Sequence, residues 1–499
     1  MRKNKSSPVK LIWQLSLVFG SLLVVSLVMV ACSNSSGTTS ASGMGKVTVS
    51  ISDPATCQAP SGPFSHVYVT ITDVQANVSS TSNSGWVDLT PNLSQSPMQV
   101  DLLGIANNQC FLATLGDPLE LQAGSYQQIR IMLASNSGTG ATGNKCGSAN
   151  NCVVVNTASG TQTYPLQLSS EAQTGIKIPS GQIAGGAFNI GAGQTEDLDI
   201  DFNTCSSIVT EGTAAQGNVQ YLLKPVLHAG EASTTSVSLN GKVVDAAGNP
   251  VAGAFVSLEQ PDPNGAKDGN GNPIDRFIVG TTTDSNGNWD ICPLTAEVDG
   301  DPNKPYDVVV TGSNSSGVLF APSIVTGIQM GSTTGTVTLN APAALNTSAL
   351  STATITGQVT SASSTNTPQA IDFSLSVLET VNKVDYTILL PANGEPNFMA
   401  STAATANGNE GCPNNADCYD YSLATEGDGA YIGTWSSGGT TLTQPNAVPA
   451  YVIDGFATET GTSTATCSAE IFSPVAFTAA SVTTPPLAGS ADVAFTGCQ

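Results

Sequence analysis

Residues 46–52 read Lys-Val-Thr-Val-Ser-Ile-Ser, and residues 66–71 read His-Val-Tyr-Val-Thr-Ile. In both stretches apolar and polar residues alternate, which is the period of a β-strand with one buried face. Short runs of this kind recur up to residue 227, with turn-forming residues between nearly all of them, and no stretch keeps a helical period over three turns. Because each such strand must bury its apolar face, the pattern predicts a sandwich of two antiparallel sheets.

The composition extends this prediction to the whole chain of 499 residues. Charged residues make up only 10% of the chain, so helix-forming Lys, Glu and Arg are scarce, whereas Gly, Ser, Thr, Ala and Asn are abundant. Hydrophobic residues make up 40%, which is enough to build buried cores. We therefore expect an all-β protein of tandem β-sandwich domains in series.

Several pieces of the first sandwich follow one another in a characteristic order. They are Val49–Pro54, Val67–Ile71, Trp86, Val100–Leu103, Leu121–Arg130, Gly175–Ile178, Leu198–Phe202 and Tyr221–Leu227. This order, over residues 44–228, resembles a bacterial family known only as domain of unknown function 4382. The resemblance implies an exported surface protein, and the family brings no established activity with it.

The middle of the chain has a different pattern of strands and turns. Residues 237–258 run as strand, turn, Pro-Val, Gly-Ala and strand, and a second tight turn follows at residues 284–288. This pattern resembles the regulatory-like domain of carboxypeptidases, a small prealbumin-type β-sandwich grouped with carbohydrate-binding-like folds. The family's usual Gly-x-Tyr is replaced here by residues 304–307, Lys-Pro-Tyr-Asp. The resemblance concerns an accessory domain and brings none of the zinc-binding catalytic residues.

These patterns divide the chain into five parts. Residues 1–31 are predicted to be a signal peptide and residues 32–45 a flexible linker. Three β-domains follow at residues 46–230, 236–342 and 352–499. Residues 353–360 echo residues 237–244, as if another sandwich began there.

The N-terminus is typical of a lipoprotein export signal. Four basic residues precede a mostly apolar stretch at 11–30, and Ala31 stands directly before Cys32. This arrangement resembles a bacterial lipobox, which implies that Cys32 is lipidated and that the rest of the chain lies outside the cytoplasm. Ser33, in place of an aspartate, favours the outer membrane or the cell surface. The alternative is an uncleaved transmembrane anchor, since about 20 apolar residues can span a bilayer.

Eleven cysteines indicate an oxidising compartment. With Cys32 acylated, ten remain, and we expect disulfides rather than a metal site because there is no Cys-x-x-Cys motif. The spacing suggests the pairs Cys146–Cys152, Cys412–Cys418, Cys467–Cys498 and Cys57–Cys110. Cys205 and Cys292 then remain to pair across a domain boundary, and spacing alone leaves this connectivity open.

The charge balance restricts the partners. The first 31 residues contain four of the 14 Lys and Arg residues and none of the 37 Asp and Glu residues, so the mature chain has 10 basic and 37 acidic side chains and a net charge of −27. A surface this acidic repels phosphate backbones, which excludes nucleic acid as a partner. The expected partners are the membrane, through the lipid anchor, and an extracellular glycan or surface protein.

Two acidic patterns could hold a hard cation. In the loop 262–275, Asp268, Asn270 and Asn272 repeat at every second position before Asp275, as oxygen ligands do in calcium loops. These four are the predicted calcium ligands, although Asp, Asn and Gly also favour plain turns, and no other cofactor is expected. The second pattern is the alternation of aspartates at 197, 199 and 201 with apolar residues. It indicates either a calcium-binding stripe or, as the favoured interpretation, the solvent face of a strand.

No catalytic motif stands out. The chain has no Gly-x-Ser-x-Gly and no His-Glu-x-x-His, and only two histidines. Exposed aromatic residues could stack on sugars, although most aromatic residues of β-sandwiches belong to cores. The candidates for such stacking are Trp86, Trp289, Trp435, Tyr306, Tyr419, Tyr421 and Tyr431.

We therefore expect a non-enzymatic cell-surface lipoprotein for adhesion, carbohydrate binding or extracellular scaffolding. An extracellular hydrolase acting on polysaccharide is the alternative, and it requires a pocket with two convergent carboxyl groups. A third hypothesis is a calcium-stabilised structural module without a ligand of its own.

Overall fold

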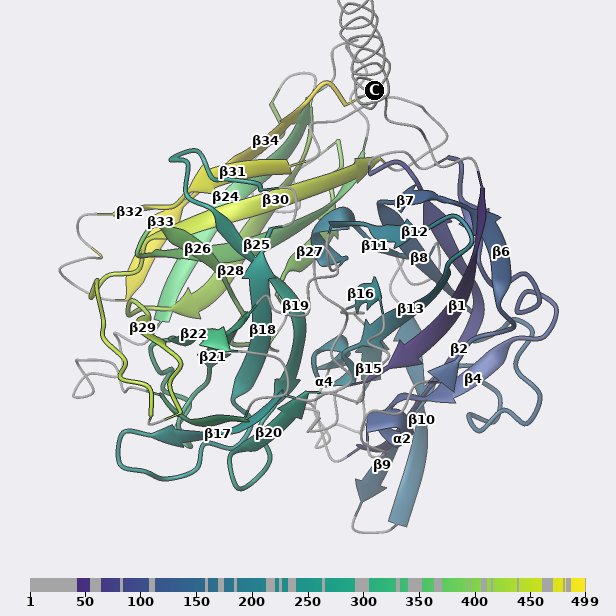
Figure 1. Ribbon diagram of the computed structural model, residues 1–499, viewed down its shortest axis with the longest axis horizontal. Helices are drawn as coiled ribbons and strands as arrows, with labels where there is room; N and C mark the ends of the chain where they lie inside the picture. Colours follow the sequence, from purple (N-terminus) through teal and green to yellow (C-terminus); the bar gives the residue numbers. More distant parts are fainter. Residues whose placement is uncertain are drawn as a thin grey trace, which may run out of the picture. The chain divides into compact units, whose positions relative to one another are not determined.

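The computed structural model describes residues 43–498 apart from several gaps, of which the longest are 54–63, 107–112, 169–174, 212–219, 232–238, 292–304, 340–351, 363–369, 405–410 and 460–469 (Figure 1). The chain divides into residues 1–43 and residues 44–499, and every described element lies in the second unit. The regular structure of the described residues is almost entirely β-strand, and their helices are the short α2 (Leu102–Ala106), η1 (Ser180–Gln182) and α4 (Thr204–Ser207). The prediction of an all-β fold with several sandwiches is confirmed.

The first sandwich consists of two main sheets. One sheet has the order β16-β13-β1-β5 with β6 on β1, and its strands are β1 (Met44–Ser52), β5 (Ala113–Thr114), β6 (Leu119–Gln122), β13 (Thr195–Phe202) and β16 (Leu227–Glu231). The other has the order β11-β8-β2-β9-β10-β15-β14 with β3 and β4 on β2, and its strands are β2 (Phe64–Asn77), β3 (Val87–Asp88), β4 (Met98–Asp101), β8 (Gln128–Leu133), β9 (Cys152–Thr157), β10 (Gly160–Leu168), β11 (Ile176–Ile178), β14 (Ile208–Glu211) and β15 (Gln220–Leu223). A small pair of strands, β7 (Gly124–Tyr126) and β12 (Phe188–Ile190), completes the domain.

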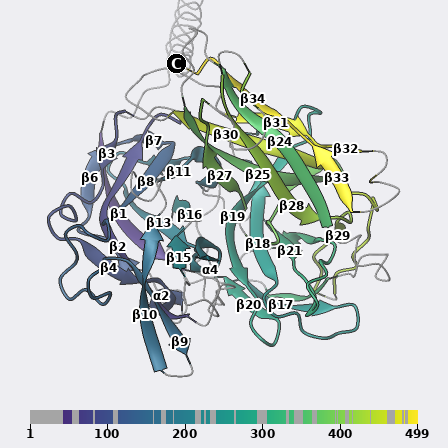
Figure 2. The same cartoon turned by 180° about the vertical axis from the view of Figure 1, so that it is seen from behind.

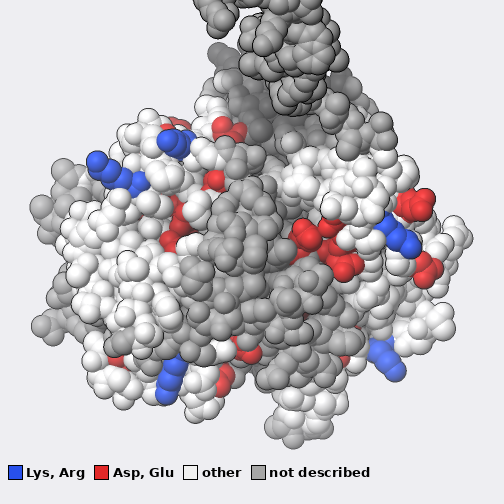
Figure 3. All heavy atoms as spheres, viewed as in Figure 1, with Lys and Arg blue, Asp and Glu red and all other residues white. Residues whose placement is uncertain are grey.

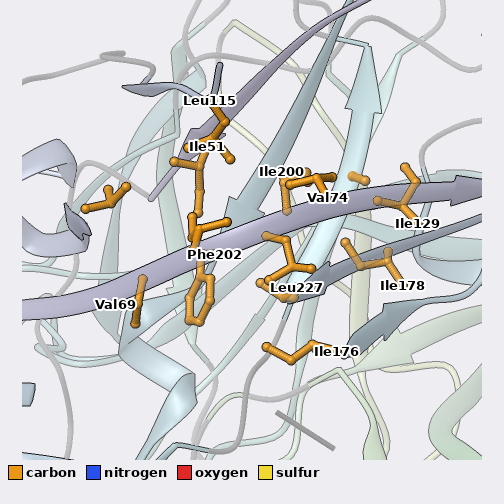
Figure 4. Close-up of a cluster of buried hydrophobic side chains, with 14 of the residues drawn as sticks. Ile51, Val69, Val74, Leu115, Ile129, Ile176, Ile178, Ile200, Phe202 and Leu227 are labelled. Carbon is orange, nitrogen blue, oxygen red and sulfur yellow. The ribbon is translucent and has the colours of Figure 1, made fainter. Parts of the chain in front are cut away.

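The alternating stretches supply the core between these sheets. The apolar residues of 46–52 and 66–71 are at most 2% exposed, and Figure 4 shows Ile51 and Val69 gathered with Ile200 and Phe202 in one apolar cluster. Burying each Val, Ile or Phe side chain stabilises the fold by about 1.5–3 kcal/mol. The polar partners in the alternation consequently face away from this core.

The expectation of purely antiparallel sheets is only partly right. β1 and β13 run parallel, with Val49 opposite Leu198 and Ile51 opposite Ile200, and β10 and β15 are also parallel. Parallel neighbours need a long crossover connection. The chain between β1 and β13 provides it, because that segment first builds most of the opposite sheet.

The described residues of the second half form three sheets. A three-stranded sheet, β20-β17-β23, comprises β17 (Leu239–Asp245), β20 (Asn288–Ile291) and β23 (Thr333–Leu339). A five-stranded sheet comprises β24 (Thr352–Ala362), β28 (Ala416–Glu426), β32 (Ala476–Phe477), β33 (Leu487–Ser490) and β34 (Val493–Thr496). The third sheet has ten strands: β18 (Phe255–Pro261), β19 (Ile274–Thr282), β21 (Tyr306–Thr311), β22 (Ser323–Ile328), β25 (Ile371–Val381), β26 (Val384–Ile388), β27 (Phe398–Ser401), β29 (Tyr431–Thr434), β30 (Tyr451–Glu459) and β31 (Glu470–Pro474). Figure 2 shows β24 and β28 layered against the part of this sheet that carries β25.

The ten-stranded sheet joins the two domains that the sequence places at 236–342 and 352–499. Its order is β29-β22-β21-β18-β19-β26-β25-β30-β31. β26 pairs in parallel with β19, and β29 pairs in parallel with β22. Backbone hydrogen bonds therefore cross from one predicted domain to the other at two places, and one continuous sheet takes strands from both.

Arg276 is the ionic centre of this shared sheet. It lies on β19, is 8% exposed, and donates hydrogen bonds to Asp262, to Asp454 Oδ2 at 2.8 Å and to Glu470. Its guanidinium also stands 5.0 Å from the ring centre of Phe456. Because Asp454 and Glu470 belong to the C-terminal strands, one buried cation links carboxylates from both halves of the sheet.

Four turns between residues 245 and 318 share one design. In each, an Asp or Asn side chain accepts the backbone N–H groups two and four residues later, and the intervening glycine has a φ between 75° and 85°. The turns are Asp245–Asn249, Asp268–Asn272, Asp284–Asn288 and Asn314–Val318. The tight turn predicted at 284–288 is therefore one copy of a repeated Asx turn.

We predict unequal costs for alanine at two of these glycines. A Cβ on Gly287 would lie 2.3 Å from the carbonyl oxygen of Val243, whereas a Cβ on Gly271 would meet nothing within 4 Å. Gly271→Ala should lower the free energy of unfolding by about 1 kcal/mol, the cost of a left-handed alanine, and Gly287→Ala by about 2–3 kcal/mol because the overlap must also be relieved. Urea unfolding of both variants measures the difference, and equal losses would contradict the prediction.

Candidate functional site

A groove of about 590 Å³ opens on the first sandwich beside β2 and β4. It combines an aromatic ring with several polar side chains. Its lining comes from β2, β4, the turn before β4 and the loop before β9: Tyr68, Asn92, Leu93, Ser96, Pro97, Met98, Gln99, Asp101, Gly116, Ala141, Thr142, Gly143 and Lys145.

Tyr68 and Asp101 are the central pair of the groove. They lie opposite each other on β2 and β4, on the face that points away from the core because the neighbours of Tyr68 are buried valines. His66 Nδ1 lies 2.7 Å from Asp101 Oδ2, and the His66 ring stacks on Tyr68 with 5.4 Å between ring centres. Burial and the charge of Asp101 raise the pKa of Tyr68, so its hydroxyl stays protonated and can donate a hydrogen bond.

The opposite wall is a loop braced by a disulfide. Cys146 and Cys152 are bonded, and both pack with Ala149 against Tyr68. Gln99 ties this loop to β4: its Oε1 accepts the N–H of Lys145 at 2.7 Å, and its Nε2 donates to Asn144 Oδ1 at 2.8 Å. The groove is thus held in shape before any ligand arrives.

This arrangement suits recognition more than bond cleavage. An aromatic face, one carboxylate, an ammonium group and side-chain amides can bind a polyhydroxylated ligand by stacking and hydrogen bonding. Asp101 is the single carboxylate among the described lining residues. The pair of carboxyl groups that a glycosidase mechanism uses is therefore not found in this groove.

Comparison with protein families identifies the sandwich that carries the groove. A family model described as "Domain of unknown function (DUF4382)" matches residues 44–225. This part of the chain is a DUF4382 domain. The match covers the groove, its disulfide loop and most of the first sandwich, in agreement with the resemblance drawn from the sequence.

Comparison with whole proteins does not extend this assignment beyond residues 44–225. No curated protein matches the chain. Among solved structures, the Bacillus anthracis TIE protein aligns over 91% of this chain and 50% of its own, at 9% identity and a TM-score of 0.15. The chain thus spans half the length of that protein. A streptococcal ancillary pilin aligns over 91% of this chain and 99% of its own, at 11% identity and a TM-score of 0.17. The Corynebacterium diphtheriae major pilin SpaA aligns over 91% of this chain and 100% of its own, at 10% identity and a TM-score of 0.15. TM-scores this low do not establish a common fold or function.

The structure places three of the four predicted calcium ligands, Asp268, Asn270 and Asn272, in one turn, and the fourth on β19. The carboxylate of Asp268 accepts hydrogen bonds from the backbone and the side-chain amides of Asn270 and Asn272, so their amide nitrogens, not oxygens, face it. Asp275 lies on β19 and shares a hydrogen bond with Asp307, while burial raises its pKa to about 9. In the described part of the chain, no three His, Cys, Asp or Glu side chains are grouped so that they could hold a metal ion.

The favoured interpretation of the aspartates at 197–201 is wrong, because the outer face of β13 is covered as well. Asp199 and Asp201 are 2% and 5% exposed. Ser52 Oγ donates to Asp199 Oδ2 at 2.7 Å, burial raises the pKa of Asp199 to about 7, and burial raises the pKa of Asp201 well above its usual value. These carboxyl groups are therefore buried polar groups and not a solvent face.

Three of the seven aromatic candidates for sugar stacking are core residues. Trp289, Tyr306 and Tyr421 are buried, and the other four, Trp86, Trp435, Tyr419 and Tyr431, are half-buried. None of the seven lines the groove among its described residues. Tyr68 lines the groove but was not among the candidates from the sequence. The signal that could have found it is that Tyr68 is the one tyrosine on the polar face of the 66–71 alternation.

Part of the cysteine scheme can be located. The structure contains the disulfides Cys146–Cys152 and Cys412–Cys418, and Cys498 is also disulfide-bonded. The lipidation site Cys32 lies outside the described residues, as do Cys57, Cys110, Cys292 and Cys467, and the side chain of Cys205 is not described. No helix in the described ranges is both long and apolar enough to cross a bilayer.

Proposed function

We propose that this chain is a non-enzymatic, exported surface protein whose DUF4382 domain binds a carbohydrate in the groove between β4 and the disulfide loop. The observation that carries the proposal is the placement of Tyr68 beside Asp101 in a groove whose walls are already fixed by Gln99 and a disulfide. A rigid site loses little conformational entropy when it binds, which favours a small polar ligand.

The wider setting supports an extracellular role. Disulfides persist in oxidising compartments, and two are formed within short loops. Lipidation at Cys32 would then attach the sandwiches to the outer membrane or the cell surface, with the central carbohydrate-binding-like domain as an accessory. Among the described residues on the face seen in Figure 3, charged side chains are scattered between uncharged ones, which suits a neutral glycan better than a highly charged partner.

A hydrolase is the second candidate, and the groove favours it less. Its described lining supplies Asp101 alone, whereas paired catalytic carboxyls stand about 5–9.5 Å apart in glycosidases. One other carboxyl pair, Asp275 with Asp307, lies in the shared sheet, where Asp275 is buried and Asp307 is half-buried.

A glycan array probed with residues 44–499 tests the proposal. We expect binding that Tyr68→Ala weakens at least about tenfold, or by about 1.4 kcal/mol, through loss of the stacking surface. Asp101→Asn should weaken it as well, which guards against a folding defect in the first variant. Tyr164→Ala, on β10 of the same domain and outside the groove, is the control. Silence across the array, or equal binding by wild type and both groove variants, would refute the proposal.

A further inference from the structure

The loop between β28 and β29 is held down by a carboxyl group from β25. Glu379 Oε1 accepts the backbone N–H of Ala430 at 2.8 Å, and the next residue, Tyr431, donates its N–H to the carbonyl of Pro322 at 2.8 Å. From Tyr431 onward the chain forms β29, which pairs with β22. Glu379 thus fixes the residues just before β29, and the pairing of β29 with β22 is one of the two places where central and C-terminal strands join.

Glu379 belongs to a cluster of acidic groups that has no basic partner among the described residues. It is 2% exposed and Glu426 is fully buried, and Glu379 Oε2, Glu426 Oε1 and Asp428 Oδ2 are buried oxygens without a hydrogen-bond partner. The hydroxyl of Tyr451 donates to the carbonyl oxygen of Glu426 at 2.9 Å. The titratable groups that face one another here are therefore Glu379 from β25, Glu426 from β28, Asp428 from the loop and Tyr451 from β30.

Buried carboxyl groups of this kind are stable only when they are neutral. An ionised carboxylate without a partner is costly to bury, and two neighbouring carboxylates also repel each other. Burial raises the pKa of Glu379 to about 8, with a contribution from Glu426, and burial raises the pKa of Glu426 to about 7. Groups whose pKa is raised on folding contribute stability below their unfolded pKa, near 4.5, and lose it as the pH rises to 7–8.

We propose that the cluster of Glu379, Glu426 and Asp428 is a proton-dependent clasp for β29. In acid the neutral carboxyl groups close around Tyr451 and hold the loop 427–430 against β25. As the pH rises they ionise, repel one another and release the loop, so β29 separates more readily from β22. The pairing of β29 with β22 would then be most stable in an acidic exterior and less stable at mildly alkaline pH. This device is independent of the glycan groove, which lies in the DUF4382 domain.

Hydrogen exchange of the mature chain at pH 5.0, 6.5 and 8.5, corrected for the intrinsic rate, tests the clasp. We expect the protection factors of residues 431–434 to fall at least about tenfold between pH 5.0 and 8.5, because the ratio of ionised to neutral carboxyl groups rises tenfold with each step of one in pH. Glu379→Gln keeps the acceptor for Ala430 but cannot ionise, so most of the fall should disappear. The double variant Glu379→Gln with Glu426→Gln should abolish the pH-dependent fall in protection. If Glu379→Gln does not fold, Glu426→Gln alone takes its place in the test.

Glu120→Gln, an exposed glutamate in the first sandwich, is the matched control and should leave the fall unchanged. Protection that does not depend on pH in the wild type, or an equal fall in the Gln variants, would overturn the proposal. So would full recovery of protection at pH 8.5 on adding calcium chloride alone, because the cluster would then hold a cation and not protons.

Discussion

Replacing Arg276 by leucine is expected to destabilise residues 44–499 by about 3–5 kcal/mol at pH 7.5, the usual cost of removing one partner of a buried ion pair. The guanidinium is the shared partner of Asp262, Asp454 and Glu470. Asp454 is fully buried, so without Arg276 its charge would be left in a poorly solvated site. Urea unfolding monitored by far-UV circular dichroism measures the loss.

The same variant should lose less at pH 4.5. Burial raises the pKa of Asp454 to about 7 and also raises that of Glu470, even though Arg276 acts in the opposite direction. Without the cation both carboxyl groups would bind protons more tightly, so acid neutralises them and removes most of the penalty. Arg130→Leu is the control, because Arg130 stacks on Trp86 and bonds to the amide of Gln75. It should cost about 1–2 kcal/mol at both pH values. A loss for Arg276→Leu that is the same at both pH values would contradict this account.

Local sequence patterns predicted the strands far better than their partners. The alternation at 46–52 and 66–71 identified which side chains are buried, because a strand's period fixes its faces without reference to the rest of the chain. The pairing of β26 with β19, and of β29 with β22, joins segments about a hundred residues apart. No local period encodes such a contact, so the sequence did not predict that strands of 236–342 and 352–499 pair with each other.

The candidate site was harder to predict for two separate reasons. The groove forms where the turn at 91–97 and the disulfide loop meet β4, and that meeting depends on tertiary packing. The loop at Asp268 is ambiguous for a chemical reason, because Asp, Asn and Gly at alternate positions satisfy a calcium loop and an Asx turn equally well. Only the direction of the Asn270 and Asn272 amides, which donate to Asp268, separates the two.

The sequence also did not predict that several acidic side chains are buried. An alternation of aspartate with leucine, isoleucine and phenylalanine normally marks a strand with one wet face. Asp199 and Asp201 are covered on that second face too, and Glu379 and Glu426 are buried without basic partners in the described part of the chain. A chain with 37 acidic and 14 basic residues has few cations with which to pair such groups, which leaves protons as the simplest way to neutralise them.

Trp289→Ala should be among the most damaging single substitutions in the second half of the protein. Trp289 lies on β20, is 1% exposed and packs in the apolar cluster that contains Leu239, Val256 and Ile291. Deleting a buried tryptophan side chain costs about 3–5 kcal/mol through lost burial and the cavity left behind. Thermal and urea unfolding of residues 44–499 would record a transition at lower temperature and lower denaturant.

Trp289→Phe distinguishes a packing role from a binding role. The indole Nε1 has no hydrogen-bond partner in the described part of the chain, so phenylalanine forfeits only volume and should cost about 1–2 kcal/mol. Trp435→Ala is the comparison, because Trp435 is half-buried at the edge of the same cluster and should cost less than Trp289→Ala. If Trp289→Ala instead kept the stability of the wild type and abolished glycan binding, the side chain would belong to a ligand site, and the assignment of binding to the groove at Tyr68 would have to be abandoned.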